Sequence, residues 1–465
     1  MGHLTSRRNF VRLALGVSGL ALIAACAPAA PTSPSAAQSG AAAQPTQPVA
    51  AAGAAQPAAT KASAASSGGA PVELVYVPHV TPNLTVDFWN REIARFQAAN
   101  PDIKVTLSAG PDTQTAKYVQ TLVASNSAPD VAALIVSEPA FWPLLQPYDQ
   151  NDPDIKQISD ASKAYINGQL LNLGIAKEAR NTIFYNKDMF AKAGIASPPK
   201  TYAELEAACE KLKAAGFTPL VTAAGSGASW VAGDALNILS DTLKKNDHWY
   251  VDYKAGKVKF TDPEWVAGAT RLQSYAGKGY VVPGALGITY AQAEQSFLSG
   301  QGAMYLMGTW FSAAAAKSPP PFEIGVAVAP SEDGPQILNG AVAWGGYSIF
   351  KSTAHPTEAL RLAKYLAFNP DELKDFLDTD GQFTGVKLTS GPLQRDLTPL
   401  QQQIQQLMDT LPFNPSQIGQ GDNTPRAGVI EPTFNQVGQA MLQGKAEPKT
   451  ELAKVDAAWA VAPTS

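Results

Sequence analysis

The chain has 465 residues, 45% of them hydrophobic, and its 35 Lys and Arg against 39 Asp and Glu give a formal net charge of −4 at pH 7. This mildly acidic balance argues against nucleic acid as a partner, because surfaces that bind nucleic acid are basic. Two cysteines, Cys26 and Cys209, are too few for a disulfide framework.

The first residues predict a secretion signal. Arg7 and Arg8 precede an apolar run from Leu13 to Ala25. A membrane-spanning helix needs roughly 20 apolar residues, so this shorter run is typical of a signal peptide. The paired arginines resemble the twin-arginine export motif. Ordinary secretion of a chain with a basic start remains the alternative.

The apolar run ends in a sequence that resembles the bacterial lipobox, Ile23-Ala24-Ala25-Cys26. In that motif the cysteine is lipidated and becomes the new N-terminus after cleavage. Acyl chains contribute about 0.8 kcal/mol per buried CH₂, so several chains would hold the protein at a membrane. We therefore expect residues 1–26 to be a lipoprotein signal and the mature chain to be anchored outside the cytoplasm. The alternative is that Cys26 is a small apolar residue in a discarded signal.

Residues 27–70 are mostly Ala, Pro, Ser, Gln, Thr and Gly, with one charged residue, Lys61, and no aromatic side chain. Such a segment buries too little apolar surface to offset the entropy of ordering it. It is predicted to be a disordered tether with an average end-to-end distance of about 35 to 40 Å.

The remainder, from Val72 onward, is long enough for two lobes, each with its own core. The first part alternates between strands and helices. Apolar or alternating patterns predict strands at 72–77, 103–107 and 130–136, and amphipathic patterns predict helices at 85–100 and 114–126. This order predicts a parallel sheet covered by helices on both faces.

The loops that follow these three strands are the first candidates for a site, because ligands bind beyond the carboxyl ends of the strands in such sheets. The loops carry His79, Asn83, Asp112, Glu138 and Phe141. We take His79, Asp112 and Glu138 as candidate ligand-binding residues. The ordinary alternative for the two acids is a solvated loop position.

The middle of the chain, residues 181–221, is predicted to hold a strand, a short helix, a longer helix and a further strand. Thr201 followed by Glu204 forms a capping box, which places the start of the longer helix. Cys209 falls on the apolar stripe of that helix and should be buried. Arg180 immediately precedes the first strand and is a further candidate, with a surface ion pair as its alternative.

The later part brings strands close to tryptophans. A glycine-bracketed apolar strand precedes Trp310 in the segment 297–317, and Trp344 precedes Gly345 and Gly346, which allow close backbone approach. Strands are predicted at 322–330 and 341–350, followed by a helix at 355–368.

Four blocks in this order resemble a known family, the family 1 extracellular solute-binding proteins, which are carbohydrate-binding subunits of bacterial ABC importers. The most specific block has a Tyr-Asn-Lys-Asp start and a Pro-Pro-Lys-Thr centre. The blocks are FYNKDMFAKAGIASPPKTYAELEAACEKLKAAGFTPL, FQAANPDIKVTL, SAPDVAALIV and FLSGQGAMYLMGTW.

The resemblance implies an α/β fold of the two-lobed periplasmic-binding-protein type (type II, doubly wound sheets) whose lobes are joined by hinge crossovers. The boundaries expected from it are 71–181 with about 320–372 for lobe 1, and 182–319 with about 373–465 for lobe 2. Trp310 matches the tryptophan that lines the cleft in the family.

A sugar has apolar C–H faces and a rim of hydroxyls, so its site needs aromatic rings and charged hydrogen-bonding groups. These two requirements, aromatic rings and charged groups, indicate candidate residues in the sequence; core packing is the alternative for each tryptophan. The candidate ligand-binding residues are Trp310, Trp344, Trp230, Asp112, Glu138, Arg180, His79, Gly345 and Gly346. Trp89, Trp249, Trp265 and Trp459 lie on helical or surface-like segments and are expected to serve in packing.

Other chemistry finds little support in the sequence. The four histidines show no metal-ligand spacing, and no Walker or dinucleotide-binding loop is present, so no metal or cofactor is expected. No nucleophile elbow is present either, and we expect a binding protein rather than an enzyme. A tethered carbohydrate-active enzyme stays an alternative, because the ~5 to 9.5 Å spacing of paired carboxylates is not visible in a sequence.

The sequence thus predicts a monomeric, lipid-anchored binding subunit that captures a sugar or oligosaccharide outside the cytoplasm and delivers it to an ABC permease. The alternatives are a binding protein for another small polar solute, such as a glycerol phosphate or an osmolyte, and a sensor subunit that signals through a membrane partner.

Overall fold

A computed structural model of the chain describes residues 70–111, 114–135, 138–158, 165–166, 168–246, 248–334, 336–414 and 427–462, without the side chains of Pro139, Tyr165, Ala341–Trp344 and Ala427. The expected signal peptide, Cys26 and the tether up to residue 69 lie outside the described residues, as does Asp112. No helix of the described part is long and apolar enough to cross a membrane.

Lobe 1 is built on a four-stranded sheet in the order β12-β3-β1-β2. Its strands are β1 (Val72–Val77), β2 (Ile103–Leu107), β3 (Val131–Ala133) and β12 (Tyr347–Ile349). β1 runs parallel to both β2 and β3, with Val72 opposite Ile103 and Tyr76 opposite Val131. This confirms the predicted parallel arrangement, although β12 joins the sheet antiparallel to β3.

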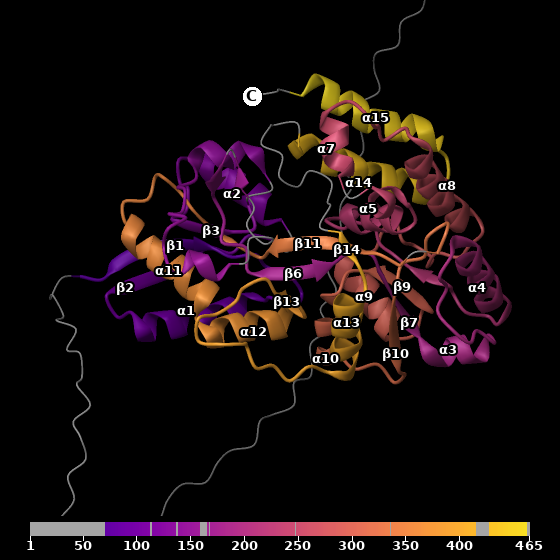
Figure 1. The fold of residues 1–465 in the computed structure, drawn as a ribbon, viewed down its shortest axis with the longest axis horizontal. Coiled ribbons are helices and arrows are strands. Elements are labelled where there is room, and N and C mark those ends of the chain that lie inside the picture. The colour runs from indigo at the N-terminus through magenta and orange to yellow at the C-terminus, as the bar shows by residue number, and fades with distance from the viewer. Residues whose placement is uncertain are drawn as a thin grey trace, which may run out of the picture. The chain divides into compact units, whose positions relative to one another are not determined.

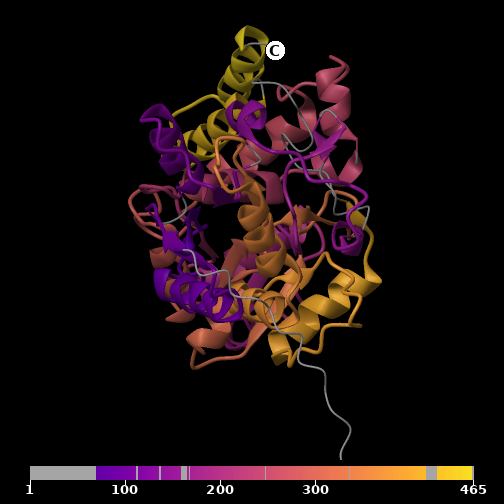
Figure 2. The ribbon, with the colours of Figure 1, turned by 90° about the vertical axis from the view of Figure 1, so that its left-hand side faces the viewer.

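Helices cover this sheet and complete the core of lobe 1. The helices and short elements are α1 (Val86–Ala99), α2 (Thr115–Ala124), η1 (Pro139–Leu144), η2 (Ile155–Gln157), β4 (Tyr165–Ile166), β5 (Gln169–Leu170), α11 (Pro356–Phe368) and α12 (Pro370–Asp380). Helix α1 begins after Thr85, whose hydroxyl accepts a hydrogen bond from the Phe88 N–H at 3.2 Å. Figure 2, in which this lobe faces the viewer, shows α1 and α11 on the near side. The rings of Phe96 and Tyr365 join these two helices edge to face at 5.2 Å.

Lobe 2 is built on a second four-stranded sheet in the order β10-β7-β9-β8. Its strands are β7 (Thr182–Asn186), β8 (Leu220–Val221), β9 (Met304–Met307) and β10 (Ile324–Val328). Its helices are α3 (Lys187–Lys192), α4 (Tyr202–Ala214), α5 (Ser229–Ile238), α6 (Thr242–Lys245), α7 (Trp249–Lys254), α8 (Pro263–Gly277), α9 (Tyr290–Leu298), α10 (Phe311–Lys317), α13 (Pro399–Thr410), α14 (Ala427–Gln443) and α15 (Pro448–Val461).

The local predictions for lobe 2 are confirmed. Thr201 and Glu204 form the expected capping box at the start of α4. Cys209 is fully buried on the apolar side of that helix. Trp249 and Trp265 are both buried and pack edge to face at 5.5 Å in the helical core, so their predicted packing role is also confirmed.

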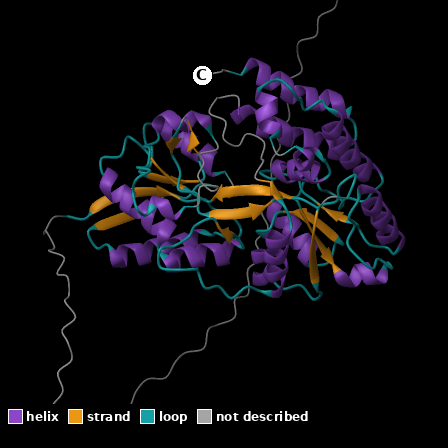
Figure 3. Cartoon of the chain, in the orientation of Figure 1, coloured by secondary structure: helices purple, strands orange, loops and turns teal. Residues whose placement is uncertain are grey.

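A third sheet, which we call the connecting sheet, lies between the two lobes (Figures 1 and 3). Its strands follow the order β13-β6-β11-β14 and are β6 (Ala176–Ala179), β11 (Leu338–Trp344), β13 (Phe383–Thr384) and β14 (Phe413–Asn414). The chain passes through it from lobe 1 to lobe 2 between β6 and β7, returns between β10 and β11, and passes to lobe 2 again between β13 and α13.

The first two crossing segments are held together by Asn181, which is fully buried. Its side-chain amide donates to the Ile337 carbonyl at 2.8 Å and accepts from the Asn339 N–H at 2.8 Å. The side chain of Asn181, on the segment that leaves lobe 1, thereby binds the backbone of the segment that returns to it. The two lobes and their crossovers confirm the predicted α/β, two-lobed fold class.

The lobe boundaries differ from those expected. Strand β10 pairs with β7 along its whole length, from Ile324 opposite Asn186 to Val328 opposite Thr182, so it belongs to lobe 2. Conversely, Leu373, Phe376 and Leu377 pack into the core of lobe 1. A single sequence shows that these segments are apolar but does not show the strand or core with which each pairs.

Candidate functional site

Three aromatic side chains of lobe 2 form a cluster that we call the aromatic platform: Trp230, which is partly buried, and Tyr290 and Trp310, which are buried. Trp230 at the start of α5 lies 5.0 Å from the ring of Tyr290 and 6.2 Å from that of Trp310, measured between ring centroids. Gly308 makes room for Trp310, because a Cβ atom at that position would lie 2.0 Å from the indole. The platform therefore depends on the glycine that the sequence places two residues before the tryptophan.

Arg180 lies at the edge of the platform, directly after β6. Its guanidinium carbon is 5.6 Å from the centroid of the Trp310 ring, within the range of a cation–π contact. Its Nη2 donates to Asp234 Oδ2 of α5 at 3.2 Å, and its Nε lies 3.9 Å from Glu178 Oε1. Arg180 thus connects the connecting sheet, the platform and helix α5.

Buried carboxyl groups continue from Arg180 toward lobe 1. Burial raises the pKa of Glu178 to about 8, an effect that the Arg180 charge opposes. Burial likewise raises the pKa of Asp380, at the end of α12, to about 7. Gln382 donates to both carboxyl groups, at 3.1 Å to Glu178 and 3.2 Å to Asp380, and Asn83 donates to Asp380 at 3.4 Å. This chain of polar groups reaches from the β1–α1 loop to α5.

Several atoms of this chain are buried without a hydrogen-bond partner among the described residues. They are Glu178 Oε1, Arg180 Nε and Gln382 Oε1. Buried polar atoms are nearly always paired, so unpaired atoms that cluster in one place call for an explanation such as a ligand or ordered water. Here they cluster beside the aromatic platform.

A cavity of about 60 Å³ opens at Arg180 and Asp234. Its other walls come from α5, α14 and β11 and are largely polar. The lining residues are Arg180, Gly233, Asp234, Asn237, Leu243, Asn339, Glu431, Phe434 and Asn435. Helix α14 approaches α5 closely, because a Cβ atom at Gly438 would lie 2.4 Å from the Ala232 carbonyl oxygen.

Glu138 of lobe 1 interacts electrostatically with Glu431, which lines this cavity. Burial raises the pKa of Glu138, and the negative charge of Glu431 raises it further. Glu138 follows β3, as the sequence predicted, whereas Glu431 belongs to α14 in lobe 2. The described residues that line the cavity come from lobe 2 and the connecting sheet.

The other predicted site residues are placed as follows. His79 is buried, its Nδ1 lies 2.9 Å from Thr115 Oγ1, and burial lowers the pKa of the imidazole to about 4. Gly345 has a φ of +65° and packs against the Phe376 ring, while Gly346 lies against the Asn172 amide. The backbone of Trp344 ends β11, but its side chain lies outside the described residues, as does all of Asp112.

Sequence reasoning missed most of the carboxyl groups. It selected Glu138 but not Glu178, Asp234, Asp380 or Glu431, and it missed Tyr290. Glu178 lies within a strand, two residues before Arg180, where an acid facing the interior is unusual and could have been noticed. The other missed residues carry no local signal, because helices with scattered acids are ordinary.

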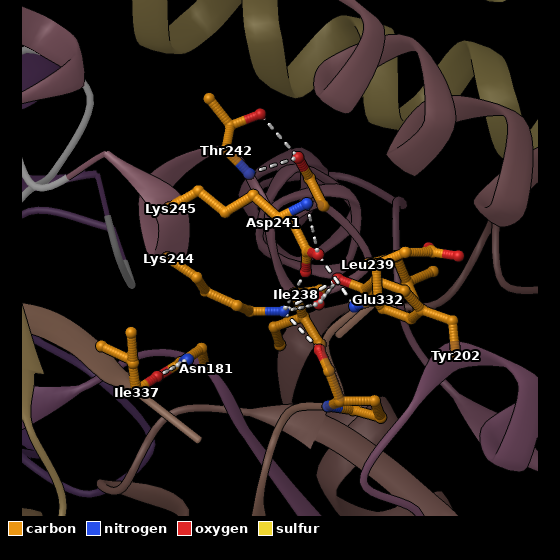
Figure 4. A network of polar contacts seen from close by, with 12 residues as sticks. Asn181, Tyr202, Ile238, Leu239, Asp241, Thr242, Lys244, Lys245, Glu332 and Ile337 are labelled. Carbon is orange, nitrogen blue, oxygen red and sulfur yellow. Dashed lines mark hydrogen bonds and ion pairs between the residues drawn. The ribbon is translucent and has the colours of Figure 1, made fainter. Parts of the chain in front are cut away.

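A network at the far end of α5 holds that helix in place (Figure 4). The buried ammonium of Lys244 donates to Tyr202 Oη at 2.8 Å, to the Ile238 carbonyl at 3.1 Å and to the Pro330 carbonyl. Arg271 donates to the Leu239 carbonyl at 3.0 Å. Cations are favourable at a helix C-terminus, so both residues stabilise the helix that carries Trp230 and Asp234.

A second hollow, of about 740 Å³, lies beside α11 in lobe 1. Both of its cations are already paired within the lobe, since Arg361 pairs with Asp102, and Lys364 pairs with Asp152 and Asp154. Nothing in it corresponds to the aromatic platform or the unpaired buried atoms. We therefore place the candidate site at Arg180.

The model of one protein family matches the sequence of this chain. The description of that family is bacterial extracellular solute-binding protein, and the match spans residues 82–372. The chain belongs to this family. Among the described residues of the solute-binding protein, no group of three or more His, Cys, Asp or Glu is placed to hold a metal ion.

Relatives of the solute-binding protein share its fold at low sequence identity. An uncharacterized ABC transporter extracellular-binding protein from Pyrococcus horikoshii is 26% identical over 229 residues, 49% of each chain. The solute-binding protein thus spans about half the length of such curated relatives. A chitin oligosaccharide binding protein has a TM-score of 0.71 and 24% identity, over 85% of this chain and 99% of its own. RafE of Streptococcus pneumoniae, in complex with raffinose, has a TM-score of 0.64 and 20% identity, over 83% and 99%.

Proposed function

We propose that this solute-binding protein captures a sugar or oligosaccharide between its lobes, with the aromatic platform against a sugar face and Arg180 and Asp234 at its hydroxyls. The observation that carries the proposal is the position of the Arg180–Asp234 ion pair beside Trp230 and Trp310. Flat rings next to charged hydrogen-bonding groups match the two kinds of surface on a sugar. The neighbours that bind raffinose and chitin oligosaccharides support a sugar over an osmolyte or a glycerol phosphate.

Binding requires the lobes to separate first. The cavity of about 60 Å³ is far smaller than the roughly 300–1,000 Å³ of small-molecule sites. Rotation about the connecting sheet would separate the lobes and admit a ligand to this region. A ligand that contacts both lobes then favours the closed state through contacts that the open state lacks.

Delivery to an ABC permease is the second part of the proposal. It is supported by membership of the family and by the description of the Pyrococcus relative. We further propose that Cys26 carries the lipid anchor and that residues 27–70 tether a monomeric binding unit outside the cytoplasm. Mass spectrometry of the mature protein from its membrane would detect the lipidated Cys26, and an unmodified N-terminus elsewhere would refute the anchor.

Titration calorimetry with a panel of raffinose, stachyose, cycloalternan and chitin oligosaccharides tests the sugar proposal. A sugar at 100 times its Kd should also stabilise the protein by about 2.7 kcal/mol. Binding of polyols, amines or glycerol phosphate in place of every sugar would refute the proposal. Turnover of a glycoside would point to the carbohydrate-active enzyme instead.

The role of the platform is tested with Trp230→Ala. We expect the sugar to bind at least tenfold more weakly, because the ring that contacts it is removed. Trp459→Ala is the matched control, since Trp459 is also partly buried in lobe 2 but packs against Tyr253 at 5.2 Å. Equal affinities for the two variants would remove Trp230 from the site.

A further inference from the structure

Helices α1 and α12 of lobe 1 meet at two buried glutamates that lie outside the candidate site. Glu92 of α1 and Glu372, in the first turn of α12, are 1% and 2% exposed, and we call them the carboxyl pair. The two side chains hydrogen-bond to each other. A carboxylate has no hydrogen to donate, so a hydrogen bond between two carboxyl groups requires a proton on one of them.

The two oxygens of each carboxyl group have different surroundings. Arg95 reaches Oε1 of both glutamates, at 2.9 Å from Glu92 and 3.5 Å from Glu372. The Tyr365 hydroxyl also donates to Glu372 Oε1, at 3.4 Å. Oε2 of each glutamate is buried and has no hydrogen-bond partner among the described residues. A proton shared within the carboxyl pair would supply the donor that these oxygens lack.

The charges around the carboxyl pair balance when one proton is present. Three acids meet two cations here: Glu92, Glu372 and Asp375 against Arg91 and Arg95. Burial acts to raise the pKa of Asp375, but its bonds to both arginines outweigh burial and hold that pKa below its usual value. Asp375 is therefore ionised at neutral pH. With one proton on the carboxyl pair, two negative charges face two positive charges and the cluster is neutral.

The titration of Glu92 agrees with this geometry. Burial raises the pKa of Glu92 from 4.5 to about 9, and so do its hydrogen bond with Glu372 and the negative charges of the two neighbouring acids, while the Arg95 charge opposes them. Two phenols also face the carboxyl pair, Tyr347 of β12 and Tyr365 of α11. Burial raises the pKa of both phenols, and the negative charges of the carboxyl pair raise it further. Neither phenol therefore adds a charge at neutral pH.

We propose that Glu92 and Glu372 share one proton at neutral pH, and that this proton holds α12 on α1 in a pH-sensitive contact that is lost in alkaline solution. Without the proton, two buried carboxylates would face each other with no donor between them, and one negative charge would lack a cation. Helix α12 leads through Gly381 into β13 of the connecting sheet. The carboxyl pair therefore anchors the lobe 1 end of the third segment that crosses between the lobes.

Infrared spectroscopy of the full protein tests for the shared proton, because the C=O stretch of a protonated carboxyl group differs from that of a carboxylate. Ordinary carboxyl groups, with pKa values of about 4, are ionised at pH 7. We expect a band of a protonated carboxyl group at pH 7 that Glu92→Gln and Glu372→Gln each remove, since either change ends the sharing. Asp87→Asn, an exposed acid on α1, is the matched control and should keep the band.

Amide exchange tests whether the proton holds α12 in place. Glutamine has the shape of a protonated glutamate and keeps a donor, so Glu92→Gln should preserve the contact at every pH. Between pH 8 and 10, the protection of the α12 amides relative to those of α8 should fall in the wild type. The same ratio should stay constant in Glu92→Gln.

Urea unfolding gives an independent measurement of the same contact. Because the pKa of Glu92 is raised on folding, its contribution to stability is complete below pH 4.5 and is lost as the pH rises through about 9. The urea midpoint of the wild type should therefore fall between pH 8 and 10 relative to that of Glu92→Gln. Asp87→Asn should follow the wild type.

Two results would overturn the inference. The same infrared band in the wild type and in Glu92→Gln would show that the carboxyl pair shares no proton. The same pH dependence of α12 exchange and of the urea midpoint in these two proteins would show that the proton does not hold the helix. If Glu92→Gln does not fold, Glu372→Gln keeps one donor in the pair as well and decides the question by the same measurements.

Discussion

Replacing Lys244 by methionine tests the network that supports α5. The side chain is almost fully buried, and its ammonium pairs with Asp241 at 3.6 Å in addition to its three hydrogen-bond acceptors. Methionine has a similar length but no donor, so the Pro330 carbonyl would lose its cationic partner. The Ile238 carbonyl would keep only the Tyr202 hydroxyl, at 3.3 Å.

Two opposing contributions determine how much Lys244→Met changes the free energy of unfolding. Breaking a buried ion pair costs about 3–5 kcal/mol when one charge is left behind. Burial, however, lowers the pKa of Lys244 from 10.5 to about 8, so holding the charge in the folded protein costs roughly 3 kcal/mol, which methionine avoids. We therefore expect Lys244→Met to lower the free energy of unfolding by about 0–2 kcal/mol at pH 7.

Urea unfolding at several pH values separates these contributions. Between pH 8 and 10.5 the unfolded chain binds the Lys244 proton while the folded protein does not, so wild-type stability should gain with rising pH. The variant should lack this gain, and its deficit should grow by up to about 3 kcal/mol. Lys245→Met is the control, because Lys245 is 41% exposed and its ion pairs are worth at most about 1 kcal/mol. A variant as stable as wild type at pH 7 with the same pH dependence would refute the reasoning.

Three further predictions concern the connecting sheet and α14. Burial raises the pKa of Glu178 from 4.5 to about 8, so its contribution to stability is complete below pH 4.5 and is lost as the pH rises to 8, by up to roughly 5 kcal/mol. In urea titrations, the stability of Glu178→Gln should therefore depend less on pH than that of the wild type. An unchanged pH dependence would contradict the raised pKa. Asn181→Leu should lower the free energy of unfolding by about 2–4 kcal/mol in the same assay, because it leaves the Ile337 carbonyl and the Asn339 N–H buried without partners. A loss below 1 kcal/mol would show that the crossing strands do not need the amide. Gly438→Ala should destabilise the protein by about 1–3 kcal/mol, because its Cβ atom would meet the Ala232 carbonyl. Gly277→Ala has open space around its Cβ atom and should stabilise the protein by up to about 1 kcal/mol. Thermal unfolding that ranks the two variants the other way would contradict the close packing of α14 on α5.

The parts of the fold that were predictable are those set by short stretches of chain. Strands β1 and β2 follow from alternating apolar residues, and the start of α4 follows from the Thr201 and Glu204 pair. The sequence predicts strand β10 in lobe 1, but it lies in lobe 2, because its partner β7 is far away in the sequence. Periodicity identifies a strand but not its neighbour.

Part of the candidate site could also be predicted from short stretches of sequence, and part could not. Trp230 and Arg180 are predicted from their places beside a glycine-rich turn and a strand, and Trp310 from its place after a strand and from the family resemblance; the structure brings these three together. The link between Gln382 and Glu178 joins residues 204 positions apart, so only the folded chain reveals it. His79 was selected for its loop, yet its ring turns inward to Thr115, a choice that depends on packing rather than on position.

The burial of Cys209 has a practical consequence. Its thiol lies in the core of lobe 2, and burial raises its pKa well above the usual range, so it stays protonated and shielded from reagents. A cysteine introduced on the rim of either lobe would then be the reactive one within the described part of the chain. An environment-sensitive dye attached there would brighten or dim as the lobes move, which would turn the protein into an optical reporter of its own solute.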